Sequence, residues 1–231
     1  ITIVILASVS IALIMIFLNY AIYSLETVAQ QAEFENAKNA MKILAEETIN
    51  TILTGAGTNV NFPSRTVRLN FITQNKNLTL KITSTGSLTQ TFEVLVDSEL
   101  LILSCNGGEY TPNENEVIYG NRSNPAFVND IYSIPIIQTK WDATVGRVTA
   151  ELNFTRLLLK KYNIQVNDDQ QLLIEIVYVD TKWEAESTIY FGIIDIIYEE
   201  TTKTTIYYDE SYSGASTLTF ELYLDGTLLG N

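Results

Sequence analysis

The first 25 residues of the chain carry no charged side chain and are almost entirely apolar. Between Ile1 and Leu18, the polar interruptions are Thr2, Ser8 and Ser10. A helix that crosses a bilayer needs about 18 to 20 apolar residues, so this segment is long enough to span a membrane. Because the segment is apolar on every side, the pattern predicts a helix that lipid or other helices must cover.

Beyond residue 18 apolar residues continue at steps of three and four, a spacing typical of one face of a helix. These positions are Ala21, Ile22, Leu25, Val28, Ala29, Ala32, Ala37, Ala40, Met41, Leu44, Ala45, Thr48, Ile49 and Ile52. Neither proline nor glycine occurs before Gly55. We therefore predict one helix of about 54 residues, roughly 80 Å long, that stops at Gly55-Ala56-Gly57. Other helices could cover the stripe, and the chain's own remaining residues would satisfy it equally well.

After Gly57 the apolar residues alternate with polar ones, which is typical of half-buried strands. Residues 66–71, 78–83 and 217–224 show the alternation most clearly. Further strands are predicted at 88–96, 98–104, 115–120, 131–138, 144–153, 171–180, 184–198 and 203–208. Arg156 to Tyr162 fits either a short helix or a strand. Glycine, asparagine and proline pairs such as Asp225-Gly226 separate these runs.

Many short strands after one long helix predict an α+β fold whose second part is an antiparallel β-sandwich-like domain. We expect an N-terminal helix at residues 1–55, apolar over 1–25 and amphipathic over 26–54, and a β-rich domain at 58–231. The latter has more strands than a minimal seven-stranded sandwich requires, so we expect an elaborated one.

Composition narrows the possible functions. The net charge of −13 argues against binding to nucleic acid, which requires clustered Lys and Arg. The chain has no histidine, and so lacks the commonest general base and metal ligand. Its single cysteine, Cys105, rules out an intrachain disulfide and has no histidine to activate it. We predict no enzymatic activity, no metal site and no cofactor.

The order of these segments, together with the stretch QQAEFENAKNAMKILAEETI, resembles the archaeal type IV pilin-like proteins, which include adhesion-filament subunits, pilins and archaellins. The resemblance implies that a peptidase removes a short basic leader, which agrees with a start at Ile1 rather than Met. It also implies that subunits leave the membrane and stack their apolar helices into a filament core, with β-domains outside. The residues expected in that core are Ile1, Val4, Ile5, Ala7, Ser8, Ile11, Ala12, Ile14, Met15, Leu18, Ile22 and Leu25.

Two positions differ from bacterial type IV pilins. This chain has Ile5 where they usually carry a glutamate, so no carboxylate is available there to pair with a neighbour's N-terminal amine. It also lacks a proline near residue 22, so we expect the helix to remain continuous. Ser8 and Ala12 are small and four residues apart, which would let two helices approach closely.

Three N-glycosylation sequons begin at Asn77, Asn121 and Asn153, and Asn121, in a polar loop, is the best placed of them. Other polar groups are weaker candidates. Glu184 and Glu186 share a strand face and are expected to form a solvated edge. The pairs Asp168-Asp169 and Glu199-Glu200 lack the spacing of a calcium loop. Aromatic residues could form a sugar-binding or subunit-contacting surface, although packing is their more usual role: Trp141, Trp183, Tyr198, Tyr207, Tyr208 and Tyr212.

We expect the chain to be a structural subunit of an archaeal surface filament used for adhesion. Its partners would be identical copies, with the membrane holding the precursor, and glycans and an unidentified adhesion target on the outside. One alternative is a monomeric ectodomain that one helix anchors in the membrane and that binds a ligand or partner. Another is an archaellin, a subunit of a motility filament.

Overall fold

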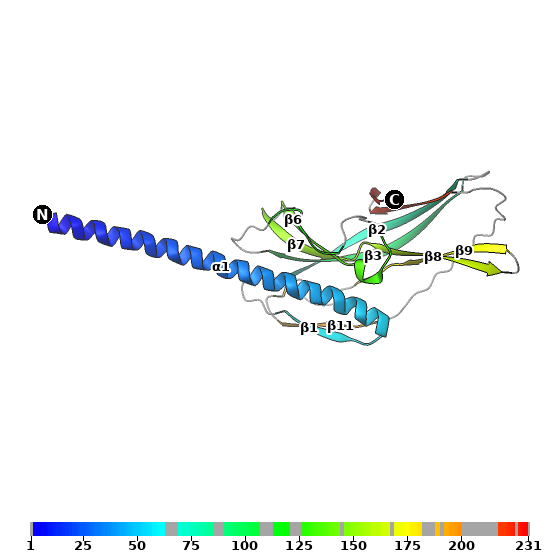
Figure 1. Cartoon of the computed structure of the whole chain (residues 1–231), viewed down its shortest axis with the longest axis horizontal. Coiled ribbons are helices and arrows are strands. Elements are labelled where there is room, and N and C mark those ends of the chain that lie inside the picture. The colour runs from blue at the N-terminus through cyan, green and yellow to red at the C-terminus, as the bar shows by residue number, and fades with distance from the viewer. Residues whose placement is uncertain are drawn as a thin grey trace.

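The chain forms one long helix that projects from a β-rich domain, as the computed structural model shows (Figure 1). The structure describes residues 2–62, 69–85, 90–106, 113–120, 126–143, 146–166, 169–181, 188–189, 192–199, 217–224 and 226–230. The helix α1 runs without a break from Thr2 to Thr54. It ends where predicted, because Gly55 adopts a left-handed conformation with φ of 67° and its N–H donates to the Thr51 carbonyl at 2.8 Å.

The strands follow in three sheets. In chain order the elements are β1 (Thr58–Phe62), β2 (Leu69–Thr85), β3 (Gln90–Asn106), β4 (Val117–Tyr119), β5 (Phe127–Val128), the 3-10 helix η1 (Ile131–Ser133), β6 (Ile136–Asp142), β7 (Arg147–Asn153), β8 (Leu157–Val166), β9 (Asp169–Val177), β10 (Thr188–Ile189), β11 (Gly192–Ile196), β12 (Thr217–Leu224) and β13 (Thr227–Gly230). The largest sheet has the order β13-β12-β2-β3-β7-β6-β4, and β10 also pairs with β2. Strands β1 and β11 form a separate antiparallel pair, and β5-β8-β9 form the third sheet.

The predicted α+β class is confirmed, because one long apolar helix precedes strands that are mostly antiparallel. Within the described residues, the exception is the parallel pairing of β5 with β8. Two sheets face each other across a small core, in which Leu80 and Leu222 of the large sheet pack with Leu157 of the third sheet. The rings of Phe127 and Phe220 meet edge to face across the same gap, 6.5 Å apart. This part of the domain is therefore sandwich-like.

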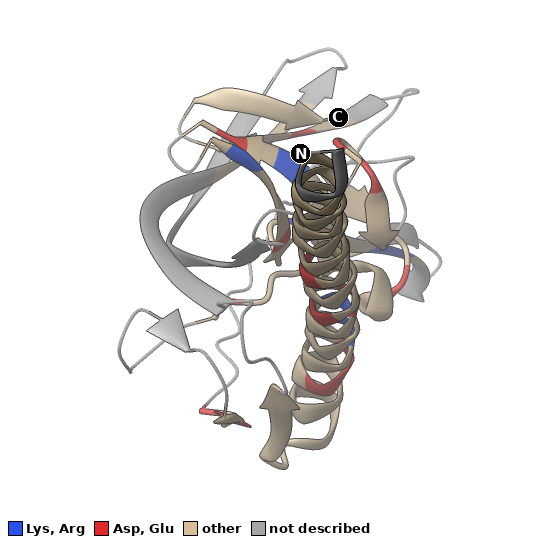
Figure 2. Cartoon of the chain, turned by 90° about the vertical axis from the view of Figure 1, so that its left-hand side faces the viewer, with Lys and Arg blue, Asp and Glu red and all other residues tan. Residues whose placement is uncertain are grey.

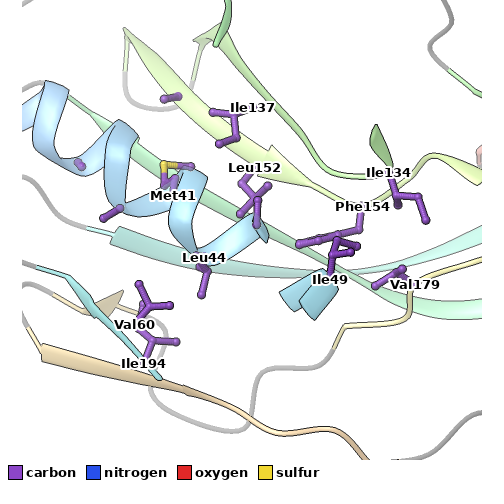
Figure 3. Close-up of a cluster of buried hydrophobic side chains, with 14 of the residues drawn as sticks. Met41, Leu44, Ile49, Val60, Ile134, Ile137, Leu152, Phe154, Val179 and Ile194 are labelled. Carbon is purple, nitrogen blue, oxygen red and sulfur yellow. The ribbon is translucent and has the colours of Figure 1, made fainter. Parts of the chain in front are cut away.

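The main core is built around the second half of α1. Met41, Leu44 and Ile49 point from the helix into it (Figure 3). Val60 of β1 and Ile194 of β11, which are register partners, meet the helix on one side. Ile137, Leu152 and Phe154 line another part of the same core, together with Ile134 and Val179. The second half of α1 is thus an integral part of the domain that the strands form.

Several strand boundaries differ from those predicted. The runs 66–71 and 78–83 were predicted as separate strands, but residues 69–85 form one 17-residue strand, β2. Likewise β3 joins the predicted strands 88–96 and 98–104. These two strands pair with each other from Leu69↔Cys105 to Ser84↔Gln90. Each therefore supplies pairing partners to the other along its length, including the polar residues that interrupt the sequence pattern.

Other segments were assigned wrongly or missed. Residues 131–138 were predicted as one strand, but they begin as η1, and β6 starts only after Pro135, which lacks a backbone N–H. The ambiguous segment 156–162 lies mainly in a strand, β8. The sequence patterns did not predict β1, which is held by pairing with β11, 130 or more residues later in the chain. The predicted strand 203–208 lies outside the described residues.

Candidate functional site

The first half of α1 is the candidate site, because the domain leaves it uncovered. From Ile5 to Glu26 every residue of the helix is exposed. Fifteen of the large apolar or aromatic side chains between residues 5 and 28 are 49% to 72% exposed, from Leu13 at the low end to Tyr20 at the high end. Figure 1 shows this half extending away from the strands. Figure 2, which looks along the helix from its N-terminal end, shows no acidic or basic residue on the first described turns of α1.

The free-energy cost of leaving this surface in water exceeds the total stability of a typical domain. Covering one large apolar side chain contributes roughly 1.5 to 3 kcal/mol. Fifteen such side chains correspond to something on the order of 20 kcal/mol or more, compared with the total stability of about 5 to 15 kcal/mol of a typical domain. The first half of α1 is therefore a surface that requires a partner, whether lipid or protein.

Three side-chain hydroxyls along this part of the helix already donate hydrogen bonds to its backbone. Ser8 Oγ donates to the Ile5 carbonyl at 2.8 Å, and Ser10 Oγ donates to the Leu6 carbonyl at 2.9 Å. Thr27 Oγ1 likewise donates to the Tyr23 carbonyl at 3.0 Å. Because each hydroxyl already donates to the helix backbone, covering it with apolar atoms does not leave its hydrogen unbonded.

Near Phe34 the apolar side of the helix changes from one that is exposed to one that packs on the strands. Leu25, Val28 and Ala32 follow one another at steps of three and four and are all exposed. Phe34, only two residues after Ala32, begins a second series that continues through Ala37 and Met41, all of which are buried against the strands. Two residues correspond to about 200° around a helix, so the apolar side shifts by roughly half a turn between the two series. The stripe that looked continuous in the sequence therefore faces two different partners.

The entry of the helix into the domain is marked by a cation beside an aromatic ring. Lys38 is 8% exposed, and its Nζ lies 2.6 Å from Glu35 Oε1 and 5.4 Å from the centre of the Phe34 ring. Further along, Tyr132 Oη donates to Asn50 Oδ1 at 3.3 Å, which ties η1 to the helix. The pKa of Tyr119, a neighbour of Tyr132, is raised by burial and then by the negative charges of Glu46 and Asp130. Of these contacts, the hydrogen bond between Tyr132 and Asn50 joins the helix to the domain.

The residues expected in a filament core lie together on the uncovered half of α1. Those whose side chains are described are all exposed: Ile5, Ala7, Ser8, Ile11, Ala12, Ile14, Met15, Leu18, Ile22 and Leu25. Val4 also lies in α1, and Ile1 lies outside the described residues. The packing on the chain's own strands involves a different set, which starts at Phe34.

The three sequons are placed differently. Asn77 lies in β2, with Asp97 of β3 as its register partner, and Asn121 lies outside the described residues. Asn153 ends β7 and is only 7% exposed. Its Oδ1 accepts hydrogen bonds from Thr155 Oγ1 at 2.9 Å and from the Thr155 N–H at 3.4 Å. The folded domain therefore encloses the Asn153 amide.

The remaining candidates do not gather into a catalytic or metal centre within the part of the chain that the structure describes. No group of three or more His, Cys, Asp or Glu side chains is close enough there to hold a metal ion. Trp141 in β6 is 53% exposed, Tyr198 is half-buried and Cys105 lies in β3. Asp169 begins β9 and Glu199 is exposed. The others lie outside the described residues: Asp168, Trp183, Glu184, Glu186, Glu200, Tyr207, Tyr208 and Tyr212.

Comparison with known proteins adds no relative. No protein-family model, no curated protein and no solved structure matches this chain. The function proposed below therefore rests on the physical character of α1 and of the domain that carries it. Among the described residues, α1 is the helix that is long and apolar enough to cross a membrane, and none of its most apolar stretch is buried within the chain.

Proposed function

We propose that this chain is the structural subunit of an archaeal extracellular filament of the type IV pilus class, which attaches cells to surfaces. Identical copies polymerise by bundling the first half of α1, and their β-rich domains face outward. The observation that carries the proposal is that a domain with a complete core of its own holds out an uncharged, uncovered helix about 30 Å or more in length.

The shift of the apolar side along α1 supports protein partners in addition to lipid. Leu25 and Val28 are 69% and 59% exposed and lie on the side that the domain does not cover. They extend the uncovered surface beyond the 18 residues from Ile1 to Leu18, which already satisfy a bilayer. A bundle of parallel helices covers such an extension, whereas a lipid bilayer of ordinary thickness leaves its end in the headgroup region.

The alternative is a monomeric ectodomain that α1 anchors permanently in the membrane. Tyr20 and Tyr23 favour a membrane-inserted state, because they stand just before Glu26, the first charged residue. Tyrosines at that position are typical of the water–lipid interface. In the filament proposal the same residues mark the depth at which the precursor waits before assembly, so the two functions differ in where the helix finally lies.

Shearing cells and imaging the released material tests the proposal. Wild-type cells should release filaments that contain this chain, and Ile11→Lys should abolish them because a lysine at that position would be buried without a counter-charge. Ile193→Lys is the matched control, since Ile11 and Ile193 are 59% and 66% exposed but Ile193 lies on β11 of the domain.

Three results decide the outcome. Filaments from Ile193→Lys cells and none from Ile11→Lys cells support the proposal. Wild-type protein that stays in the membrane fraction, without filaments, supports the anchored monomer instead. Cells that lack the chain should lose surface attachment and still swim; loss of swimming would assign the filament to motility.

A further inference from the structure

The side of α1 that faces away from the domain stays free of charge well past the apolar half. This outer face consists of Val28, Ala29, Ala32, Asn36, Asn39 and Ile43, which recur at steps of one, three and four and are all exposed. Val28 and Ile43, its two large apolar members, are 59% and 51% exposed. Between Val28 and Ile43 the helix α1 carries four charged residues, and every one lies off this face: Glu33, Glu35, Lys38 and Lys42. The side of a helix that faces water typically carries charged residues, so an exposed side without charge indicates that a partner covers it.

The outer face is continuous with the uncovered half of the helix. Leu25 precedes it by one turn on the same side, and Glu46, the next residue along that side after Ile43, carries a charge. The uncharged strip is thus about 18 residues long from Leu25 to Ile43, or about 27 Å. Alanines at two of its positions would let a neighbouring helix approach closely, and Asn36 and Asn39 can hydrogen-bond across a helix pair.

The charges that border the outer face are complementary. Lys42 flanks it on one side and Glu33 on the other, while Glu46 and Glu47 lie beyond its far end. Glu35, on the same side as Lys42, is already paired with Lys38 at 2.6 Å. When parallel copies of one helix lie side by side around an axis, the left border of one copy meets the right border of the next. The basic border would then meet the acidic border, as flanking charges do in coiled coils.

We propose that the outer face is a second interface between copies of this chain, and that a neighbouring copy's α1 covers it. The inference rests on the proposed filament, and it extends the contact between helices from Leu25 to Ile43, alongside the domains. The helical bundle then reaches about 27 Å past the apolar half, so each domain is held at its base as well as by its apolar helix. A domain held in this way would resist bending relative to the filament axis.

Two neighbouring residues provide a matched test. Ala32 and Gln31 are both exposed, but Ala32 lies on the outer face and Gln31 lies off it, on the side of Lys42. In the native host, Ala32→Lys should lower the yield of sheared filaments at least about tenfold, because it places a charge in a desolvated contact. Ile43→Lys should have the same effect at the far end of the face. Gln31→Lys should assemble like the wild type.

Folding is checked on detergent-extracted subunits by circular dichroism and by their resistance to protease, which should be unchanged in all three variants. Filaments of wild-type yield and thermal stability from both Ala32→Lys and Ile43→Lys would overturn the inference and leave the proposed function standing. Equal losses in Gln31→Lys would overturn it as well, because the effect would then not be specific to the outer face. Absence of filaments from the wild type itself would instead refute the proposed function.

Discussion

At the scale of single residues, Asn153 shows how the fold selects among similar sequence signals. Its sequon is as complete as the other two, yet its side chain is 7% exposed and its Oδ1 is held by Thr155. A sugar at Asn153 would have to displace the packing at the end of β7.

We predict that Asn153 carries no glycan in the assembled protein. Mass spectrometry of peptides from sheared material tests this directly, because each sequon falls in a different stretch of the sequence. A glycan on Asn77 or Asn121 would leave this prediction standing. A glycan on a substantial fraction of Asn153 would contradict its enclosed position.

Lys38 is the second informative residue, since a buried cation is costly without partners. Here the partners are the Glu35 carboxylate and the face of the Phe34 ring, both within one turn of the same helix. The group sits where α1 first meets the domain. It therefore lets a charged residue occupy the entrance to the core without an unpaired charge.

At the scale of elements, α1 has two halves with opposite requirements. Residues 5–26 of the first half are all exposed, and the second half supplies Phe34, Met41 and Ile49, each 0% exposed, to the main core. A single helix thus joins a surface that requires a partner to a domain that has its own hydrophobic core. Forces on the domain would pass directly into any bundle that the first half enters.

Two isoleucines of the same helix test this division. Ile49→Ala should lower the free energy of unfolding of the domain by about 2 to 5 kcal/mol, because it leaves a cavity in the core. Ile11→Ala should leave that free energy unchanged, because Ile11 is 59% exposed and lies in the half of α1 that extends away from the strands. Urea denaturation of the full chain in detergent measures both. Equal destabilisation by the two substitutions would contradict the division.

Local sequence signals predicted much of this architecture. The absence of glycine and proline before Gly55 predicted the unbroken helix, and the alternation over 217–224 predicted β12 with its observed bounds. The β1–β11 pair was not predictable in the same way, because Val60 meets Ile194 only through a contact between distant parts of the chain. The 17-residue length of β2 and β3 also depends on their mutual pairing.

The candidate site was predicted in part. A lack of charge identified the first half of α1, but the stripe beyond it looked like one surface. Only the burial of Phe34 beside the exposure of Ala32 reveals that it is two. Val28 and Ile43 were not selected as assembly residues from the sequence, although the missing charges around them were a visible signal. The spacing of apolar residues identifies a helix face that must be covered, but it does not identify what covers that face.

At the scale of the whole molecule, charge and apolar surface are separated along the chain. All of the net charge of −13 lies after residue 25, on the helix's second half and the domain. The charges keep domains soluble and apart, while the uncharged helix favours association. A head-to-tail arrangement that does not close satisfies both, because it places helices together at the axis and domains at a larger radius, and such an arrangement grows into a fibre.

Electron microscopy of the full-length chain after removal of detergent is the most direct test of this arrangement. We expect filaments whose axis is a column of packed helices, formed by the first half of α1, with the β-rich domains outside it. Single particles that stay dispersed only while detergent is present, and that never form filaments, would contradict it.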